Sequence, residues 1–420
     1  MLNWLWYLTV VLSIWGAAFG GYHIPGLGTI FPFRIVILLV GLLVLIKCDK
    51  KKIKIKPVIL YCTVLPVIIF LMCQTAVSAV WADSMPGVFS ALLNLAYILI
   101  FVVLFLYFCR DDKVLSGTII AIGCNLLVIF LFALLEIFSG QYIFNPAAQK
   151  KYSTLLNHFG LHHPAVCFDN TNNLAYCICL SVPILFYLSE RVFSGKPVLQ
   201  KLSLVFMAAL SLFILIQTFS FIGYLTFGLV LVLCLVIRIK DRRRITVLLV
   251  VLSASTLLFC IGAFILYNSE LIKRMPDILQ EQTNSVNIRI TLIKKAAYIM
   301  KDSYFLGVGP GNIDSFMKQT IIDSKMTKML DIHEFYFEMG AVYGILPLAF
   351  LLYLQCKTYL ASYRSIINSG KEKWIAMLCL PITIGFIPAS AMLSSTMFFA
   401  LMWIQFAVWS TFLYKKHAIT

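Results

Sequence analysis

Long apolar runs constrain the fold of this chain more than any other feature of its sequence. The runs are roughly 17 to 25 residues long, the length that an α-helix needs to cross about 30 Å of hydrocarbon. The composition agrees, with 61% hydrophobic residues, 12% charged residues and a mean hydropathy of +0.93, values that soluble domains do not reach. The sequence therefore predicts an all-α integral membrane protein, with residues 1–420 forming a single polytopic membrane domain.

About twelve transmembrane helices are expected from these runs. The first run has no basic segment before it and no small-residue cleavage site, so we expect a retained span and not a signal peptide. The approximate spans are 2–19, 30–46, 57–80, 87–109, 114–138, 171–189, 199–217, 219–237, 245–267, 335–356, 374–391 and 394–413.

The basic residues set the expected orientation. Of the 34 Lys and Arg residues, 22 fall in six short segments that share one side of the membrane if the N-terminus is inside. Both termini are therefore expected to be cytoplasmic. The net charge of +16 lies in these clusters and forms no continuous stripe, which argues against nucleic-acid binding. Arg34 lies inside the second run, where it can snorkel outward or face the bundle.

Two long loops are expected on the outer side, at residues 139–170 and 268–334. The second separates spans 9 and 10, is predicted to be partly helical, and is long enough to suggest that it carries part of an active site. The twelve cysteines are dispersed and lie mostly in apolar runs, so no disulfide and no metal cluster are expected.

The first outer loop ends in a cluster of asparagines, Asn170, Asn172 and Asn173, at the entrance of the sixth span. One asparagine suffices to cap a helix N-terminus. Because amides both donate and accept hydrogen bonds, the others are candidates for binding a sugar or an anion. Capping alone remains the structural alternative for this cluster.

The second outer loop holds a basic stretch that begins at Arg289, with Arg274 upstream. A solvated basic surface is one interpretation. The alternative is a diphosphate clamp, since the planar guanidinium binds phosphate through two hydrogen bonds. Gly307 to Gly311 contains a GxGxG string, but no strand precedes it and Pro310 removes a donor, so a rigid turn is expected and a dinucleotide fold is excluded.

Three further ionisable residues lie near span ends. His333 opens the tenth span above Gly340 and Gly344, and an interfacial packing histidine is the structural alternative to a catalytic one. Glu338 lies on another face of that helix and could cap a neighbour or touch substrate. Glu136, near the outer end of the fifth span, is an ionisable group at membrane depth and hence a functional candidate.

Taken in order, these motifs resemble the O-antigen ligase and polysaccharide polymerase superfamily. The stretch from Phe168 to Ala175 resembles F-G-N-P-N-x-x-A, and Arg289 to Asn312 resembles R-x-x-x-W followed by P-L-L-G-V-G-P-G-N. His333 to Gly344 is similar to H-N-x-Y-L followed by G-I-x-G, and Glu136 with Gly140 to E-x-x-x-G. The chain departs from this pattern at four places: His163 stands for an Arg, Thr171 for Pro and Glu334 for Asn, and Gln217 to Tyr224 lacks an Arg.

The resemblance implies a metal-independent glycosyltransferase with no cofactor, in the bacterial cytoplasmic (inner) membrane. Its donor would be an oligosaccharide linked to a polyprenyl diphosphate such as undecaprenyl diphosphate, and its acceptor a glycan or a lipid-linked acceptor, in surface polysaccharide biosynthesis for the cell envelope. His333 would be the general base. Arg289 and then Arg274 would hold the diphosphate, and Asn170 and Asn172 would position sugar or phosphate. Glu338 and Glu136 are further candidate substrate contacts.

Two other classes of protein remain possible from the sequence. A transporter or flippase of lipid-linked oligosaccharide would also have many spans and a basic cavity, but it would be expected to show related halves and polar breaks at the midplane. A sensor or structural membrane protein would leave the histidine and asparagine motifs without a function. The asymmetric long outer loop favours an enzyme.

Overall fold

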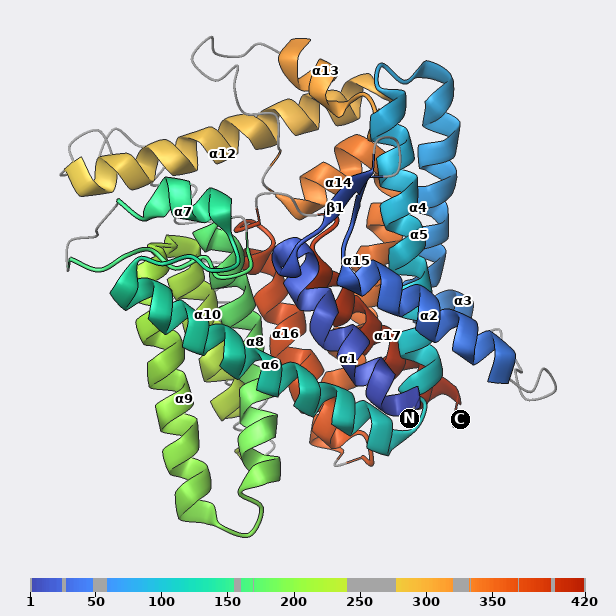
Figure 1. Ribbon diagram of the computed structural model, residues 1–420. Coiled ribbons are helices and arrows are strands. Elements are labelled where there is room, and N and C mark those ends of the chain that lie inside the picture. Colours follow the sequence, from blue (N-terminus) through green and yellow to red (C-terminus); the bar gives the residue numbers. More distant parts are fainter. Residues whose placement is uncertain are drawn as a thin grey trace.

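The chain is almost entirely helical (Figure 1). The computed structural model describes residues 2–24, 28–47, 59–154, 160–168, 170–239, 277–319, 332, 334–368, 370–393 and 397–418. Its α-helices are α1 (Leu2–Trp15), α2 (Pro32–Lys47), α3 (Ile59–Cys62), α4 (Leu65–Ser78), α5 (Met85–Phe108), α6 (Asp112–Ser139), α7 (Pro146–Tyr152), α8 (Thr171–Val192), α9 (Pro197–Thr218), α10 (Phe221–Val236), α12 (Asp277–Asp302), α13 (Ile313–Gln319), α14 (Phe335–Tyr343), α15 (Ile345–Ile367), α16 (Lys373–Ala389) and α17 (Ala400–Ala418).

Short elements complete the described part of the chain. Two 3₁₀ helices, η1 (Gly16–Phe19) and η3 (Ala79–Trp81), extend the ends of α1 and α4. One antiparallel hairpin pairs β1 (Tyr22–Ile24) with β2 (Gly28–Ile30) between α1 and α2. The expected all-α class therefore holds apart from this hairpin.

Helices occupy every expected span whose residues are described. The ninth expected span, 245–267, lies outside the described residues. By length and composition, five of the described helices can cross a membrane: α5, α6, α8, α9 and α15. Four shorter apolar helices, α1, α4 with η3, α10 and α16, fall below that length. A multi-pass membrane protein is confirmed, and the number of twelve spans stays a prediction.

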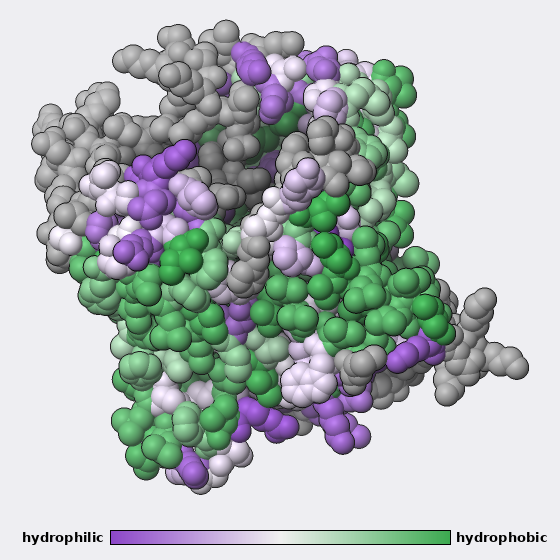
Figure 2. All heavy atoms as spheres, viewed as in Figure 1, coloured by the Kyte–Doolittle hydropathy of each residue, from purple (hydrophilic) through white to green (hydrophobic). Residues whose placement is uncertain are grey.

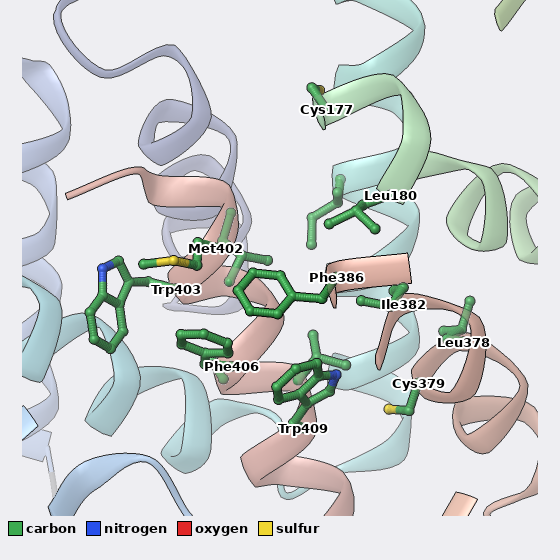
Figure 3. Close-up of a cluster of buried hydrophobic side chains, with 14 of the residues drawn as sticks. Cys177, Leu180, Leu378, Cys379, Ile382, Phe386, Met402, Trp403, Phe406 and Trp409 are labelled. Carbon is green, nitrogen blue, oxygen red and sulfur yellow. The ribbon is translucent and has the colours of Figure 1, made fainter. Parts of the chain in front are cut away.

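Helix α8 is the central helix of the bundle. Of its most apolar stretch 78% is buried inside the protein, against 17% for the neighbouring α9, so α9 presents its apolar side chains outward. Helix α8 packs against α10, α9, α16 and α6. Phe386 of α16 packs ring against ring with Phe406 and Trp409 of α17 (Figure 3). A central helix with such close neighbours has a fixed N-terminus, and that terminus carries the asparagine cluster.

Hydrophobic side chains form a broad belt around the middle of the molecule, with hydrophilic ones gathered toward its two ends (Figure 2). Both termini lie at one of these ends, and α12 crosses the opposite end (Figure 1). Helices α2, α9 and α15 expose apolar side chains, among them Leu42, Phe206 and Leu352. An exposed apolar band of this kind is what a lipid bilayer covers.

The tenth expected span is broken. We expected one regular helix from residue 335 to 356, but α14 ends at Tyr343 and α15 starts at Ile345, with Gly344 at φ +91° between them. The turn at residues 305–309 packs beside this break and hydrogen-bonds to the backbone groups that the break leaves without helical partners. Phe305 O accepts from Ile345 N at 2.9 Å, and Gly309 N donates to Val342 O at 2.8 Å. The prediction that Gly340 and Gly344 lie on one face of a continuous helix is therefore wrong, because the helix ends between them.

Candidate active site

The N-terminus of α8 is capped as the sequence predicted. Asn170 Oδ1 accepts a hydrogen bond from Asn173 N at 2.9 Å, and the helix begins at Thr171. Thr171 thus occupies the first helical position, where proline is favoured because the missing N–H would be unused anyway. The replacement of the family's Pro by Thr171 is therefore compatible with the same local structure. Asn172, which does not serve as the cap, is half-buried.

Glu136 anchors the loop that leads into α8. Its side chain is only 2% exposed, and its Oε2 accepts from the backbone N–H groups of Ala165 and Val166, each at 2.8 Å. The neighbouring Gly140 ends α6 in a left-handed conformation, at φ +65°. A Cβ there would lie 2.6 Å from His162 Nε2, so a glycine is required. The E-x-x-x-G motif thereby fixes the path of residues 162–166, and Glu136 contributes through backbone contacts.

His163, which stands where the family pattern has an arginine, belongs to the same loop. Its Nδ1 lies 3.0 Å from Gln217 O at the end of α9, so this nitrogen donates the hydrogen bond. Burial lowers the pKa of His163, which keeps the imidazole neutral near neutral pH. The chain has therefore lost the positive charge at this position, and any cation for an anionic substrate has to come from elsewhere.

Arg289 on α12 is a candidate for such a cation. It projects from α12 toward the C-terminal end of α16, where its Nη1 donates to Ala391 O at 2.7 Å. Burial lowers the pKa of its guanidinium from the usual high value. A guanidinium has five N–H donors in a planar fork. Arg289 is thus half-buried and held by its contact with Ala391.

Glu334 also contacts the C-terminal end of α16. It is the N-cap of α14, because its Oε2 accepts from Phe337 N at 2.8 Å, while Oε1 accepts from Ser390 Oγ at 3.2 Å. Burial raises the pKa of this carboxyl, although both contacts oppose the rise. An asparagine, the family's usual residue here, would cap the helix in the same way through its side-chain oxygen.

Two of the predicted site residues, His333 and Arg274, lie outside the described residues. The chain neighbour of His333 is Glu334, whose position at the end of α16 is described above. Glu338 lies one turn further along α14 and is half-buried. The long-loop part of the candidate site is therefore defined by Arg289 and Glu334.

Lys295 on α12 is a charged residue that the sequence analysis treated only as part of a basic stretch. It is 3% exposed, and its Nζ lies 3.4 Å from Met317 O of α13. Its neighbours on the same helix face, Leu292 and Ile299, are buried in a small core under α14. The spacing of three and four residues between Leu292, Lys295 and Ile299 was the signal that could have predicted this burial.

The structure joins the predicted residues into two groups. Glu136 and Asn170 hold the loop before α8. Arg289 and Glu334 each contact the end of α16, Arg289 through Ala391 O and Glu334 through Ser390 Oγ. The groups are linked through an aromatic layer, in which Phe386 contacts both Phe335 of α14 and Tyr176 of α8, with ring centroids 5.5 and 6.5 Å apart. These ring contacts connect α14, which Glu334 caps, with α8, which Asn170 caps.

Comparison with known proteins gives a family match over the part of the chain that contains the second group. Residues 206–352 match the family model described as O-Antigen ligase. That segment includes Arg289, His333, Glu334 and Glu338, whereas Glu136 and the asparagine cluster precede it. No curated protein matches the chain. The match confirms the resemblance to the O-antigen ligase and polysaccharide polymerase superfamily that the sequence motifs indicated.

Proposed function

We propose that the protein is a membrane glycosyltransferase that polymerises or ligates oligosaccharides linked to a polyprenyl diphosphate. The reaction takes place at the outer face of the bacterial cytoplasmic membrane, in the synthesis of a surface polysaccharide. Both termini are then cytoplasmic, in keeping with the 22 basic residues of the six inner segments. The reaction needs no metal and no cofactor.

The observation that carries the proposal is the half-buried Arg289, which lies in the segment that matches the O-antigen ligase family. A half-buried guanidinium that meets a backbone carbonyl, and no carboxylate among the described residues, favours the binding of an anion. In the proposed reaction that anion is the diphosphate of the lipid-linked donor. Arg274 is the second candidate for the same role.

The proposed chemistry is a displacement at the anomeric carbon of the donor sugar. A hydroxyl oxygen of the acceptor forms the new bond to this carbon, and the bond between the carbon and the diphosphate oxygen breaks. The lipid diphosphate leaves with the bonding electrons, and Arg289 stabilises its charge. The hydroxyl proton passes to His333, which acts as the general base.

The remaining candidates have positioning roles in this proposal. Asn170 caps α8 and Asn172 follows within its first turn, so both are proposed to orient sugar or phosphate at that helix end. Glu136 holds the loop before α8 through two backbone N–H groups, and Glu338 is a further candidate substrate contact. Each of these roles predicts impaired transfer with the protein still inserted.

The direct test uses purified full-length protein in liposomes that contain a lipid-linked repeat unit. The proposal predicts that longer lipid-linked glycans appear together with released polyprenyl diphosphate. Movement of intact repeat units to the other leaflet without new glycosidic bonds would instead show a transporter and contradict the proposal.

A further inference from the structure

A cavity of about 660 Å³ lies between α1, α2, α5, the loops before α7 and α8, and the start of α17. It is within the range of ligand pockets, roughly 300–1,000 Å³. Phe168 and Asn173 line it, so the cavity reaches the loop and the first turn of α8 to which the proposed function assigns substrate positioning. None of its lining residues lies in the segment that matches the family.

Arg34 gives this cavity its charge. The sequence allowed Arg34 either to snorkel outward or to face the bundle, and the structure shows that it lines the cavity. Its Nη2 donates to Asn94 Oδ1, and its Cζ lies 4.7 Å from the ring centroid of Phe31 and 4.8 Å from that of Tyr97. Two aromatic rings and an amide thus hold the guanidinium in place.

The cavity offers no acidic partner to Arg34 among the described residues that line it. The neutral Asn94 orients the guanidinium but leaves its charge uncompensated. A positive charge at membrane depth is costly unless it pairs with an anion. His163, where the family pattern has an arginine, supplies no charge. The cavity therefore has the electrostatic character of an anion site.

The other walls of the cavity are mainly apolar and aromatic. Phe144 packs against Trp15, and Phe399 packs against Phe168, with ring centroids 4.9 and 5.7 Å apart. The indole N–H of Trp15 donates to Asn125, and that of Trp403 donates to Met397 O, so both donors are already used. A ligand that fits these walls combines an anionic head with an apolar chain.

We propose that this cavity binds the phosphate group of an isoprenoid lipid carrier, with Arg34 as the residue that contacts the phosphate. The inference rests on the proposed function and deepens it by assigning a lipid-phosphate subsite separate from Arg289. The aromatic walls cover the first part of the isoprenoid chain, and Asn94 keeps the guanidinium turned toward the cavity. Arg34 then acts in substrate binding and not in bond cleavage.

The test measures binding to the purified full-length protein in detergent, without any transfer reaction. The probes are undecaprenyl diphosphate, undecaprenol without phosphate, and inorganic pyrophosphate. Arg34→Gln is expected to weaken undecaprenyl diphosphate binding roughly ten- to hundredfold and to leave undecaprenol binding unchanged. Arg110→Gln is the matched control, because Arg110 also lies over a tyrosine ring, that of Tyr414, but does not line the cavity.

A second readout does not depend on the variants. Cys167 lines the cavity, so undecaprenyl diphosphate should slow its reaction with a thiol reagent in the wild-type protein, measured on the Cys167 peptide by mass spectrometry. Undecaprenol and pyrophosphate should protect Cys167 much less. This comparison remains informative if Arg34→Gln does not fold.

Three outcomes would overturn the inference: equal affinity of Arg34→Gln and wild type for undecaprenyl diphosphate, equal protection of Cys167 by undecaprenol, or binding of pyrophosphate as tight as that of the lipid. In each case a wild type that still binds undecaprenyl diphosphate and elongates glycans would leave the proposed function intact. A wild type that neither binds this lipid nor transfers sugar would refute the proposed function itself.

Discussion

At the scale of single residues, Arg289 is the side chain on which the proposed chemistry depends most. Its side chain is half-buried and meets the end of α16 through Ala391 O. A lysine keeps the charge but loses the planar fork, and the loss of such a charged contact costs on the order of 1.5 to 3 kcal/mol. Arg289→Lys should therefore lower the transfer rate roughly ten- to hundredfold if the contact forms in the transition state.

The control for Arg289 is Lys294→Gln, which removes an exposed charge from the same helix. It should leave both the rate and the thermal stability near the wild-type values. Glycan synthesis by Arg289→Lys at the wild-type rate would show that Arg289 only fastens α12 to α16.

Glu334 predicts a pH dependence of stability. Burial raises its folded-state pKa above the unfolded value, so its contribution to stability is full at pH values below the unfolded pKa. That contribution is lost as the pH rises through the folded pKa. Between about pH 4 and pH 8, the wild type should thus lose more thermal stability than Glu334→Gln, whose amide can also cap α14. If the melting temperatures of the two proteins changed equally with pH over this range, the result would contradict a raised pKa of Glu334 in the folded protein.

The sequence predicted the local structure of this site but not the contacts between residues far apart in the chain. It predicted that one asparagine of the cluster can cap the helix, because asparagine before an apolar run is a local signal, and the structure shows that this residue is Asn170. It could not show that Glu136 binds Ala165 and Val166, since that contact joins residues 29 and 30 positions apart. For the same reason it left the orientation of Arg34 open, which depends on Asn94 in another helix.

At the scale of elements, the break between α14 and α15 is held by the turn that follows α12. Gly307 and Gly309 have φ values of +83° and +86°, and this turn supplies N–H groups to the last carbonyls of α14. The turn also binds the α4–α5 corner, since Trp81 Nε1 donates to Val308 O at 3.1 Å. The expected turn at Gly307–Gly311 is present; it lies between α12 and α13 in the chain and packs against the end of α14.

Gly344 should be the most sensitive position of this junction. An alanine there would have to adopt φ +91°, and its Cβ would lie 2.6 Å from Leu306 O. Gly344→Ala should destabilise the protein by about 2 kcal/mol or more, through backbone strain and overpacking together. The measurement is the thermal unfolding of the purified protein.

Gly195→Ala separates strain from packing in this experiment. Gly195 also has a positive φ, +78°, but a Cβ there meets nothing within 4 Å. We expect it to cost about 1 kcal/mol. If the two variants melted at the same temperature, the short distance between residue 344 and Leu306 O would contribute nothing to the loss of stability.

Apolar run length predicted the helices well, because a helix in hydrocarbon must satisfy all its backbone groups internally. It failed at Gly344, where Phe305 O satisfies the N–H of Ile345 from another part of the chain. It also missed the β1–β2 hairpin, a pair of three-residue strands too short to give an alternating pattern.

At the scale of the whole molecule, the proposed orientation places α12 outside and the turn between α8 and α9 inside. Lys301, in the last turn of α12, and Lys196, before α9, are both exposed. With the native cysteines replaced, Lys301→Cys should react with a membrane-impermeant thiol reagent in intact cells. Lys196→Cys should react only after lysis, and the reverse pattern would invert the proposed topology.

In the proposed function this membrane protein transfers glycans, with His333 as the general base. The most direct measurement is glycan chain length and lipid-linked single repeat units per molecule of purified His333→Gln in the liposome assay. Glutamine keeps hydrogen bonding but cannot accept the proton, so the account predicts accumulated single repeats and a rate lower by about 10²- to 10⁴-fold. Normal chain elongation by a folded His333→Gln would contradict the claim.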